Sequence, residues 1–259
     1  MARFLIIKQN MSKNAIRNHW DNNVCDYDPD CNFAQIDEQR FLRFPYLARE
    51  LEFWKDQGKT ILEIGVGSGS DACLSLRSSQ PKRYVLLDVS YNTIGVSKRH
   101  LEEHCLKKPY ELILGDATEM GFDDQTFDRV KAIGSLHHIP DIEKVVTEIS
   151  RVLKVGGDFI WMMYNKNSLR NKLVYPLVAS VKGIHQSNLV LLVDGVSNPF
   201  TQLVSKSDIK KMANQAGLIC DKFSTYELSR IERVILKKLS NLVERTLGWA
   251  IYVHGRKVV

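Results

Sequence analysis

The amino-acid sequence predicts an α/β fold built on a parallel sheet. From Lys59 to Tyr164, short apolar stretches alternate with segments of helical periodicity, and this alternation is typical of right-handed βαβ units. Three apolar stretches end in a loop that carries glycine or a carboxylate, at Leu62–Ser70, Tyr84–Asp88 and Leu112–Asp116. Because parallel strands end at the same edge of a sheet, we expect these loops to form one ligand-binding crevice.

The individual elements follow from periodicity and turn signals. Strands are expected near residues 60–64, 83–88, 110–114, 128–134 and 156–164, with helices between them at about 70–79, 91–105 and 141–153. A further helix near 207–216 precedes strands at about 218–226 and 249–254. Between these last strands we expect one amphipathic helix. Its apolar stripe comprises Leu228, Ile231, Ile235, Leu239 and Leu242.

Two segments lie outside this repeating pattern. Residues 1–57 are expected to form an N-terminal helical lid, with an Asp- and Asn-rich breaker at 21–32 and Pro45 dividing the second helical stretch. If Met11 is an alternative start, residues 1–10 are a loose leader. Within the remaining domain, 58–259, residues 165–206 form an insertion. Both segments are expected to flank the mouth of the crevice.

The loop after the first strand carries the pattern Glu63-x-Gly65-x-Gly67-x-Gly69. Glycines let backbone N–H groups approach a ligand closely, because no Cβ intervenes. A carboxylate before the first glycine would repel a pyrophosphate, but it could accept a hydrogen bond from an ammonium. Asp88 lies nineteen residues past Gly69, about where an acid accepts from ribose hydroxyls. These residues predict an adenosine cofactor that has an ammonium and no phosphate.

Two further pieces complete a recognisable series. With Gly115-Asp116-Ala117 and Ser135–Asp141, the chain resembles the class I (Rossmann-like) S-adenosylmethionine-dependent methyltransferases, most strongly over residues 60–165. The resemblance implies a seven-stranded sheet of order 3-2-1-4-5-7-6, with strand 7 antiparallel and helices on both faces. It also implies S-adenosyl-L-methionine as cofactor and S-adenosyl-L-homocysteine as product. The Ser135–Asp141 motif resembles that of quinone-biosynthesis and natural-product methyltransferases.

The resemblance also implies a set of cofactor-binding residues. Asp116 would read the adenine amino group beside the backbone N–H of Ala117, with a helix N-cap as the alternative role. Arg40 could clamp the methionine carboxylate from the N-terminal segment. The full expected set is Glu63, Gly65, Val66, Gly67, Gly69, Asp88, Val89, Asp116, Ala117, Gly134 and Arg40.

His137 and His138 are the candidate catalytic residues, because they follow the fourth strand near the expected sulfonium. Histidine titrates near neutral pH and could accept a proton from a hydroxyl or ammonium during methylation. The alternative is that an imidazole braces the loop, since proximity alone can supply ~7–11 kcal/mol of the barrier. Nothing near these two histidines indicates a metal site, because the sequence offers no third ligand at a useful spacing. The expected acceptor contacts are Tyr27, Tyr164, Asn165 and Asp194.

Charge is unevenly placed along the chain. The formal net charge is +6, yet residues 1–165 carry 21 basic and 24 acidic side chains, whereas residues 166–259 carry 15 and 6. An acidic substrate, a membrane surface, nucleic acid or simply a solvated helix face would account for this. No arginine-rich or aromatic-interleaved run favours RNA. Five scattered cysteines without a CxxC pair indicate reduced thiols in a cytoplasm.

The sequence therefore predicts a methyltransferase that acts on an oxygen or nitrogen of a small-molecule acceptor. Apolar residues 173–181 and 189–193 beside basic side chains leave open a lipid or quinone acceptor at a membrane surface, although no apolar run approaches the roughly 20 residues of a spanning helix. RNA methylation and a non-catalytic cofactor-binding subunit are further alternatives. The acceptor and the oligomeric state, a homodimer included, stay open.

Overall fold

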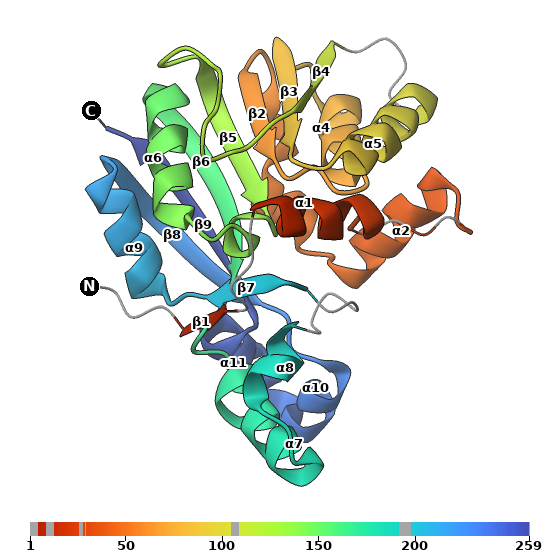
Figure 1. Cartoon of the computed structure of the whole chain (residues 1–259), viewed down its shortest axis with the longest axis vertical. Coiled ribbons are helices and arrows are strands. Elements are labelled where there is room, and N and C mark those ends of the chain that lie inside the picture. The colour runs from red at the N-terminus through yellow and green to blue at the C-terminus, as the bar shows by residue number, and fades with distance from the viewer. Residues whose placement is uncertain are drawn as a thin grey trace.

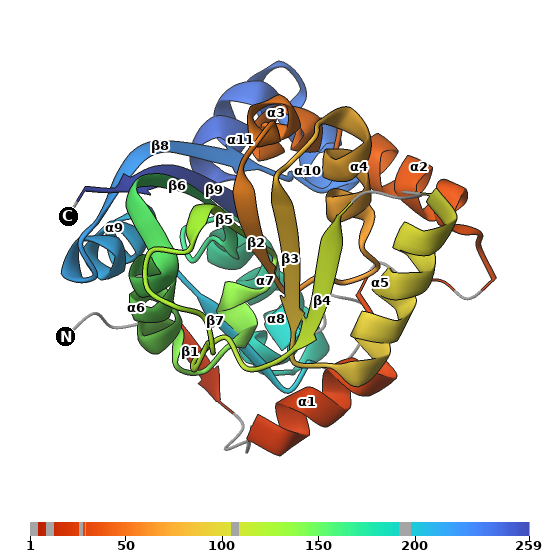
Figure 2. The ribbon, with the colours of Figure 1, turned by 90° about the horizontal axis from the view of Figure 1, so that it is seen from above.

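A seven-stranded sheet organises the chain, with helices on both of its faces (Figures 1 and 2). The computed structural model describes residues 5–8, 13–25, 28, 30–104, 109–191 and 198–258. The strand order is β4-β3-β2-β5-β6-β9-β8, in which β9 runs antiparallel to both of its neighbours. Counted among these seven strands, this is the order 3-2-1-4-5-7-6. The predicted fold class and topology are confirmed.

The strands of the main sheet lie close to the predicted ranges. They are β2 Thr60–Ile64, β3 Arg83–Asp88, β4 Tyr110–Leu114, β5 Phe127–Ile133, β6 Leu153–Tyr164, β8 Leu218–Tyr226 and β9 Ala250–Lys257. All five residues of β2 are buried, because helices cover a parallel sheet on both sides. Strand β6 begins earlier than expected and contains Gly156 and Gly157.

Helices of the βαβ units cover both faces of the sheet, and Figure 2 shows α6 and α9 on the opposite side from α4. These are α4 Ser70–Ser78, α5 Tyr91–His104, α6 Ile142–Val152 and α9 Lys206–Gln215. In α6 the buried residues include Ile142, Val145, Val146 and Ile149, at the spacing of one helix face. They pack into the main core with Trp161 of β6, which fixes the helix against the sheet.

Most of the described residues between 13 and 56, which we call the N-terminal segment, are helical, as predicted. It comprises α1 Lys13–Asn22, α2 Phe33–Arg43, α3 Leu47–Leu51 and the 3₁₀ turn η1 Phe53–Asp56. A capping box of Asn32 and Gln35 begins α2. The chain leaves the helix between Arg43 and Leu47, around Pro45, where the division was expected.

A second, two-stranded sheet was not predicted. Strand β1, Leu5–Lys8, pairs antiparallel with β7, Phe200–Leu203, at the end of the insertion. The interpretation of residues 1–10 as a loose leader is therefore wrong for residues 5–8, whose backbone groups bond to β7. Strand β7 lies far from β1 in the sequence, so local sequence could not reveal the pairing.

The insertion and the C-terminal helices form a lobe below the main sheet in Figure 1. The insertion contains the π-helical turn η3 Arg170–Val174, α7 Tyr175–Lys182, α8 Gln186–Leu191 and β7. The prediction of a single amphipathic helix before the last strand is wrong. This helix is divided into α10 Arg230–Leu236, η4 Lys237–Leu239 and α11 Ser240–Leu247, because Lys237 has a φ of 45°. Among the described residues, no helix is long and apolar enough to cross a bilayer.

Candidate active site

A cavity of about 1500 Å³ opens at the carboxyl edge of the main sheet. This volume exceeds the roughly 300–1,000 Å³ of a typical small-ligand site, so the cavity has room for a cofactor and an acceptor together. It is lined by the glycine loop, by the N-terminal segment and by residues of β6, the insertion and the C-terminal strands. The predicted residues among its lining are Arg40, Glu63, Gly65, Val66, Gly67, Asp88, Val89, Asp116, Ala117, Gly134, His138 and Tyr164.

The glycine loop between β2 and α4 has a backbone that favours glycine. Gly65, Gly67 and Gly69 have φ angles of 77°, 57° and 87°, in the left-handed region that other residues rarely adopt. A Cβ on Gly65 would lie 2.3 Å from Cβ of Ser135. Helix α5 supports the loop, because Ser97 Oγ donates to the carbonyl oxygen of Gly67 at 2.9 Å. Gly69 is not among the lining residues and is instead the N-cap residue of α4.

Asp88 ends β3 and holds the loop beside it. One carboxylate oxygen accepts from the backbone N–H of Val66 and the other from that of Ser90, both at 2.9 Å. Burial raises the pKa of Asp88, and these hydrogen bonds oppose the shift. An ionised carboxylate has about four acceptor positions, so Asp88 can also accept from the two hydroxyls of a ribose.

Asp116 follows β4 and is paired with Lys13 of α1. Lys13 Nζ lies 2.7 Å from Oδ2 of Asp116 and 2.9 Å from Oγ1 of Thr118. Burial would raise the pKa of Asp116, but the bonds from Lys13 and from the Thr118 backbone lower it. Nothing in the local sequence predicted this partner. Helix α1 therefore contacts the end of the cavity where adenine is expected.

Glu63 and Arg40 lie at the other end of the expected cofactor site. Tyr84 Oη donates to Glu63 Oε2 at 2.5 Å, and burial, together with the nearby Asp71, raises the pKa of Glu63 to about 8. The Arg40 guanidinium bonds both oxygens of Asp71, at 2.8 and 2.7 Å. Arg40 therefore reaches the cavity but also connects α2 to the first turn of α4.

The two candidate catalytic histidines differ in position. His138 lines the cavity, and its Nδ1 lies 3.2 Å from the carbonyl oxygen of Phe200 and 3.0 Å from Asn198 Nδ2. His137 is fully buried and is not among the lining residues. Burial, and then the neighbouring His138, holds the pKa of His137 well below its usual range. The neutral His137 ring packs 3.9 Å from the ring of Tyr164.

The expected acceptor contacts are only partly brought together. Tyr164 lines the cavity, whereas Asn165 does not. The Asn165 amide donates to the carbonyl oxygen of Gly248 and accepts from the backbone N–H of Asn167, both at 2.9 Å, which braces the start of the insertion. Tyr27 and Asp194 lie outside the described residues.

Sequence reasoning missed Arg170 and Glu227, which also line the cavity. The Arg170 guanidinium lies 5.1 Å from the ring centre of Trp249. Glu227 has a φ of 72° and accepts from Tyr46 Oη at 2.7 Å, and burial raises its pKa. Glu227 directly follows β8, which runs parallel to β6. Its position directly after a strand could have identified Glu227 as a candidate, whereas no sequence signal pointed to Arg170.

Residues 62–161 match the family described as "Methyltransferase domain". Over these residues the chain is similar to the class I, S-adenosylmethionine-dependent methyltransferases. Over 105 residues it is 34% identical to a fatty-acid O-methyltransferase of Mycolicibacterium smegmatis, covering 40% of this chain and 37% of that protein. Over 172 residues it is 24% identical to a ubiquinone/menaquinone biosynthesis C-methyltransferase of Bartonella bacilliformis, covering 62% and 64%. The chain thus spans about a third to two thirds of these relatives.

The fold of the domain is similar to that of solved methyltransferases over nearly the whole chain. One such structure is magnesium protoporphyrin IX methyltransferase from Synechocystis PCC 6803 with bound SAH, at a TM-score of 0.64 and 13% identity, covering 95% of this chain and all of that one. The residues of this chain also fit the cofactor of the family. The loop would clash if Gly65 carried a Cβ, and the carboxylates of Asp88 and Glu63 line the cavity beside it.

Proposed function

We propose that this chain is an enzyme that transfers the sulfonium methyl group of S-adenosylmethionine to an oxygen or nitrogen of a small-molecule acceptor. The observation that supports this proposal most is the continuity of the cavity. It extends from the glycine loop to His138, Tyr164, Arg170 and Glu227, beyond the residues that a cofactor alone would need. A non-catalytic cofactor-binding subunit would have no use for this second compartment.

Four groups are assigned to the cofactor, which supplies an electrophilic methyl group when bound. Asp88 accepts from the ribose hydroxyls and Glu63 from the ammonium, since each is a cavity-lining carboxylate beside the glycine loop. Asp116, with the backbone N–H of Ala117, reads the adenine amino group. Lys13 competes for the same Asp116 carboxylate, so this contact links the position of α1 to the cofactor.

His138 is assigned to proton transfer from the acceptor. Its Nδ1 lies beside the carbonyl oxygen of Phe200 and the Asn198 amide of the insertion, which orient the ring. We assign the proton of the acceptor to the other ring nitrogen, Nε2. Trp20 of α1 lies with its ring centre 5.1 Å from that of His138, which walls this part of the cavity against water. A positioned base contributes about 10²–10⁴-fold, and orientation of the two reactants supplies the remainder.

The test combines binding with turnover. Calorimetry should detect cofactor binding to the wild type and none to Gly65→Val, whose side chain would overlap Ser135. Methyl-labelled cofactor is then offered with alcohols and phenols, amines and carboxylic acids, and with matched compounds that lack these groups. Label should pass only to the oxygen and nitrogen acceptors. Tight cofactor binding without transfer to any class would favour the non-catalytic subunit.

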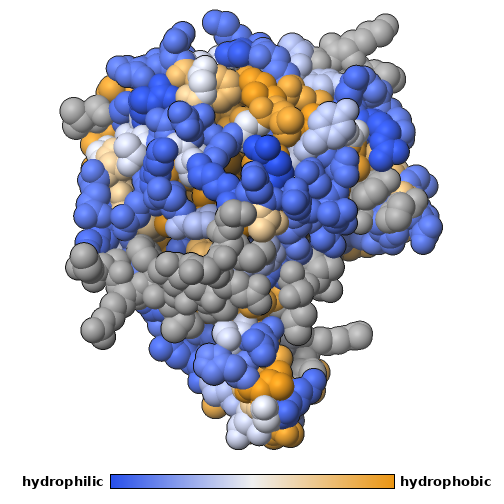
Figure 3. All heavy atoms as spheres, viewed as in Figure 1, coloured by the Kyte–Doolittle hydropathy of each residue, from blue (hydrophilic) through white to orange (hydrophobic). Residues whose placement is uncertain are grey.

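A lipid acceptor at a membrane surface is the second candidate. Leu173, Leu177 and Val181 follow one another at four-residue spacing along η3 and α7, and they are 60%, 64% and 81% exposed. Figure 3 shows apolar side chains on the lobe that holds these helices. Residues 159–193 contain no Asp or Glu but include Lys166, Arg170, Lys172 and Lys182. An apolar stripe beside basic residues is typical of interfacial helices.

Vesicle sedimentation separates the two candidates. Wild-type chain should bind vesicles that contain anionic lipid more tightly than neutral ones, because each basic residue near the surface contributes about 1 kcal/mol. Val181→Glu should weaken this binding, whereas Leu42→Glu on α2, at an apolar residue that is also largely exposed, should not. Equal, weak binding to both vesicle types would leave the soluble acceptor as the function.

A further inference from the structure

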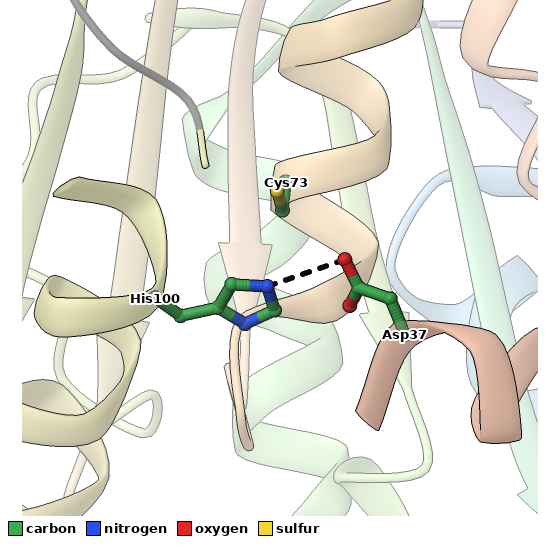
Figure 4. Close-up of side chains that lie close together, drawn as sticks. All are labelled: Asp37, Cys73 and His100. Atoms are coloured by element: carbon green, nitrogen blue, oxygen red, sulfur yellow. Dashed lines mark hydrogen bonds and ion pairs between the residues drawn. The ribbon is translucent and has the colours of Figure 1, made fainter. Parts of the chain in front are cut away.

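Asp37, Cys73 and His100 converge beneath the glycine loop (Figure 4). They come from three different helices, α2, α4 and α5. Their possible ligand atoms all lie within 4.8 Å of one another. Cys73 and His100 are fully buried, and the Asp37 side chain is 14% exposed. Sulfur, imidazole nitrogen and carboxylate oxygen are the donor types that zinc accepts in proteins.

The spacing of two of these donors suits a common metal ion. His100 Nε2 lies 3.3 Å from Asp37 Oδ2. Two ligands at about 2.0–2.1 Å from a tetrahedral centre are about 3.3 Å apart. The imidazole and the carboxylate therefore already have the separation that one zinc ion would impose, and the Cys73 sulfur lies within 4.8 Å of both.

The second nitrogen of His100 is held as in a metal-binding histidine. His100 Nδ1 lies 2.8 Å from the carbonyl oxygen of Ser68, so Nδ1 can keep its hydrogen there when a metal displaces the proton on Nε2. Such an outer hydrogen bond to a backbone carbonyl is the usual arrangement for histidine ligands. The ring of Phe33 stacks on the imidazole at 4.5 Å and fixes its orientation.

Asp37 leaves an unsatisfied atom in this cluster. Its Oδ1 is buried and has no hydrogen-bond partner among the described residues. A buried carboxylate oxygen without a partner costs free energy. The ion pair with His100 uses Oδ2 only, so it does not remove this cost, whereas a cation bound between the three side chains would.

We propose that Asp37, Cys73 and His100 form a binding site for a zinc-like divalent cation, with Oδ1 of Asp37 as a further oxygen ligand. Binding releases the thiol proton of Cys73 and any second proton on His100 to solvent. Because Asp37 belongs to the N-terminal segment and His100 bonds Ser68 of the glycine loop, the ion would fasten that segment to the cofactor loop. The site does not depend on the acceptor or on methyl transfer.

Cobalt(II) provides a direct readout on the full-length chain. Chelator-treated, reduced protein is titrated with Co²⁺ and then with Zn²⁺. We expect one equivalent of Co²⁺ to give a thiolate-to-metal charge-transfer band and the intense visible bands of a tetrahedral ion, which Zn²⁺ then removes. Cys73→Ser should abolish the charge-transfer band. Asp37→Asn and His100→Gln should weaken Co²⁺ binding at least tenfold.

Cys31→Ser is the matched control, because Cys31 lies on the same N-terminal segment with its sulfur 3.5 Å from Asp28. This variant should keep the wild-type Co²⁺ spectrum. An octahedral spectrum, or a charge-transfer band that survives in Cys73→Ser, would overturn the proposal. If the buried variants fail to fold, the nearly isosteric Asp37→Asn decides by itself: saturating zinc should raise the melting temperature of the wild type but not of Asp37→Asn, and no rise in the wild type would also refute the site.

Discussion

Replacement of Asp88 is the sharpest test of the cofactor site, because this carboxylate both holds the loop and is assigned to the ribose hydroxyls. Its oxygens accept from the buried backbone N–H groups of Val66 and Ser90. In Asp88→Ala both donors lose their acceptor, and each buried orphan costs ~1–3 kcal/mol of folding stability. The hydrogen bonds from the charged carboxylate to ribose are worth a further ~1.5–3 kcal/mol in binding. Asp88→Asn keeps one acceptor oxygen and therefore disturbs the loop less.

The assay is calorimetric titration with S-adenosylmethionine, well below the melting temperature of each variant. A loss of ~1.5–3 kcal/mol corresponds to a Kd about 10- to 150-fold higher, which we expect for both Asp88→Asn and Asp88→Ala. The melting temperature should fall more in Asp88→Ala, because that variant leaves two donors unpaired rather than one.

Asp128→Asn supplies the matched control. Asp128 also accepts from a backbone N–H, that of Thr60 at 2.8 Å, but at the start of β2 and β5 on the opposite edge of the sheet. This variant should lose stability and keep the wild-type Kd. Unchanged affinity in folded Asp88→Asn would sink the ribose assignment. An equal loss in Asp128→Asn would show that the effect is global instability.

Three further predictions follow from the same site. The pKa of Glu63 is raised to about 8, and a bound ammonium favours the ionised carboxylate. Cofactor affinity should therefore rise with pH through about 8. Glu63→Gln should remove this pH dependence of the affinity, as measured by calorimetry from about pH 6 to 9. His138→Ala should lower turnover by ~10²–10⁴-fold with cofactor affinity near wild type, and retained turnover would leave proximity as the mechanism. Amide exchange in residues 13–56 and 165–191 should slow more when S-adenosylhomocysteine and acceptor are bound together than when S-adenosylhomocysteine is bound alone. Unchanged exchange in both segments would place the acceptor elsewhere.

The main sheet could be predicted from the sequence because its signals are local. Parallel strands buried on both faces give continuous apolar runs, as in β2, where every residue is buried. Glycine and carboxylates at the strand ends then mark the carboxyl edge. For this reason the strand bounds lie within three residues of the expected ranges, and Glu63, Asp88 and Asp116 meet in one cavity.

The rest depends on partners distant in sequence. Strand β1 pairs with β7, which lies far away in the sequence, and Lys13 pairs with Asp116. No local sequence pattern marks either partner of these pairs. The break in the C-terminal helix follows from the positive φ of Lys237. A lysine in the sequence does not predict such a backbone conformation. Asp37, Cys73 and His100 lie 36 and 27 residues apart, far beyond the spacing of a metal-binding motif.

The two halves of the cavity are held by different kinds of contact. Beside its apolar contacts, the N-terminal segment is joined to the elements around the cofactor site by charged and polar bonds. These bonds join Lys13 to Asp116, Asp21 to Ser90, Asp37 to His100 and Arg40 to Asp71.

Exposed bonds of this kind are worth little, since water replaces them at a cost of about 0–1 kcal/mol, and Lys13 is 66% exposed. The acceptor compartment, in contrast, is built on the buried cluster of Tyr164, Leu203 and Trp249. Opening α1 away from Asp116 would therefore cost far less than disturbing the acceptor compartment. We infer that the cofactor enters by displacement of α1, while the more rigid insertion and C-terminal strands select the acceptor.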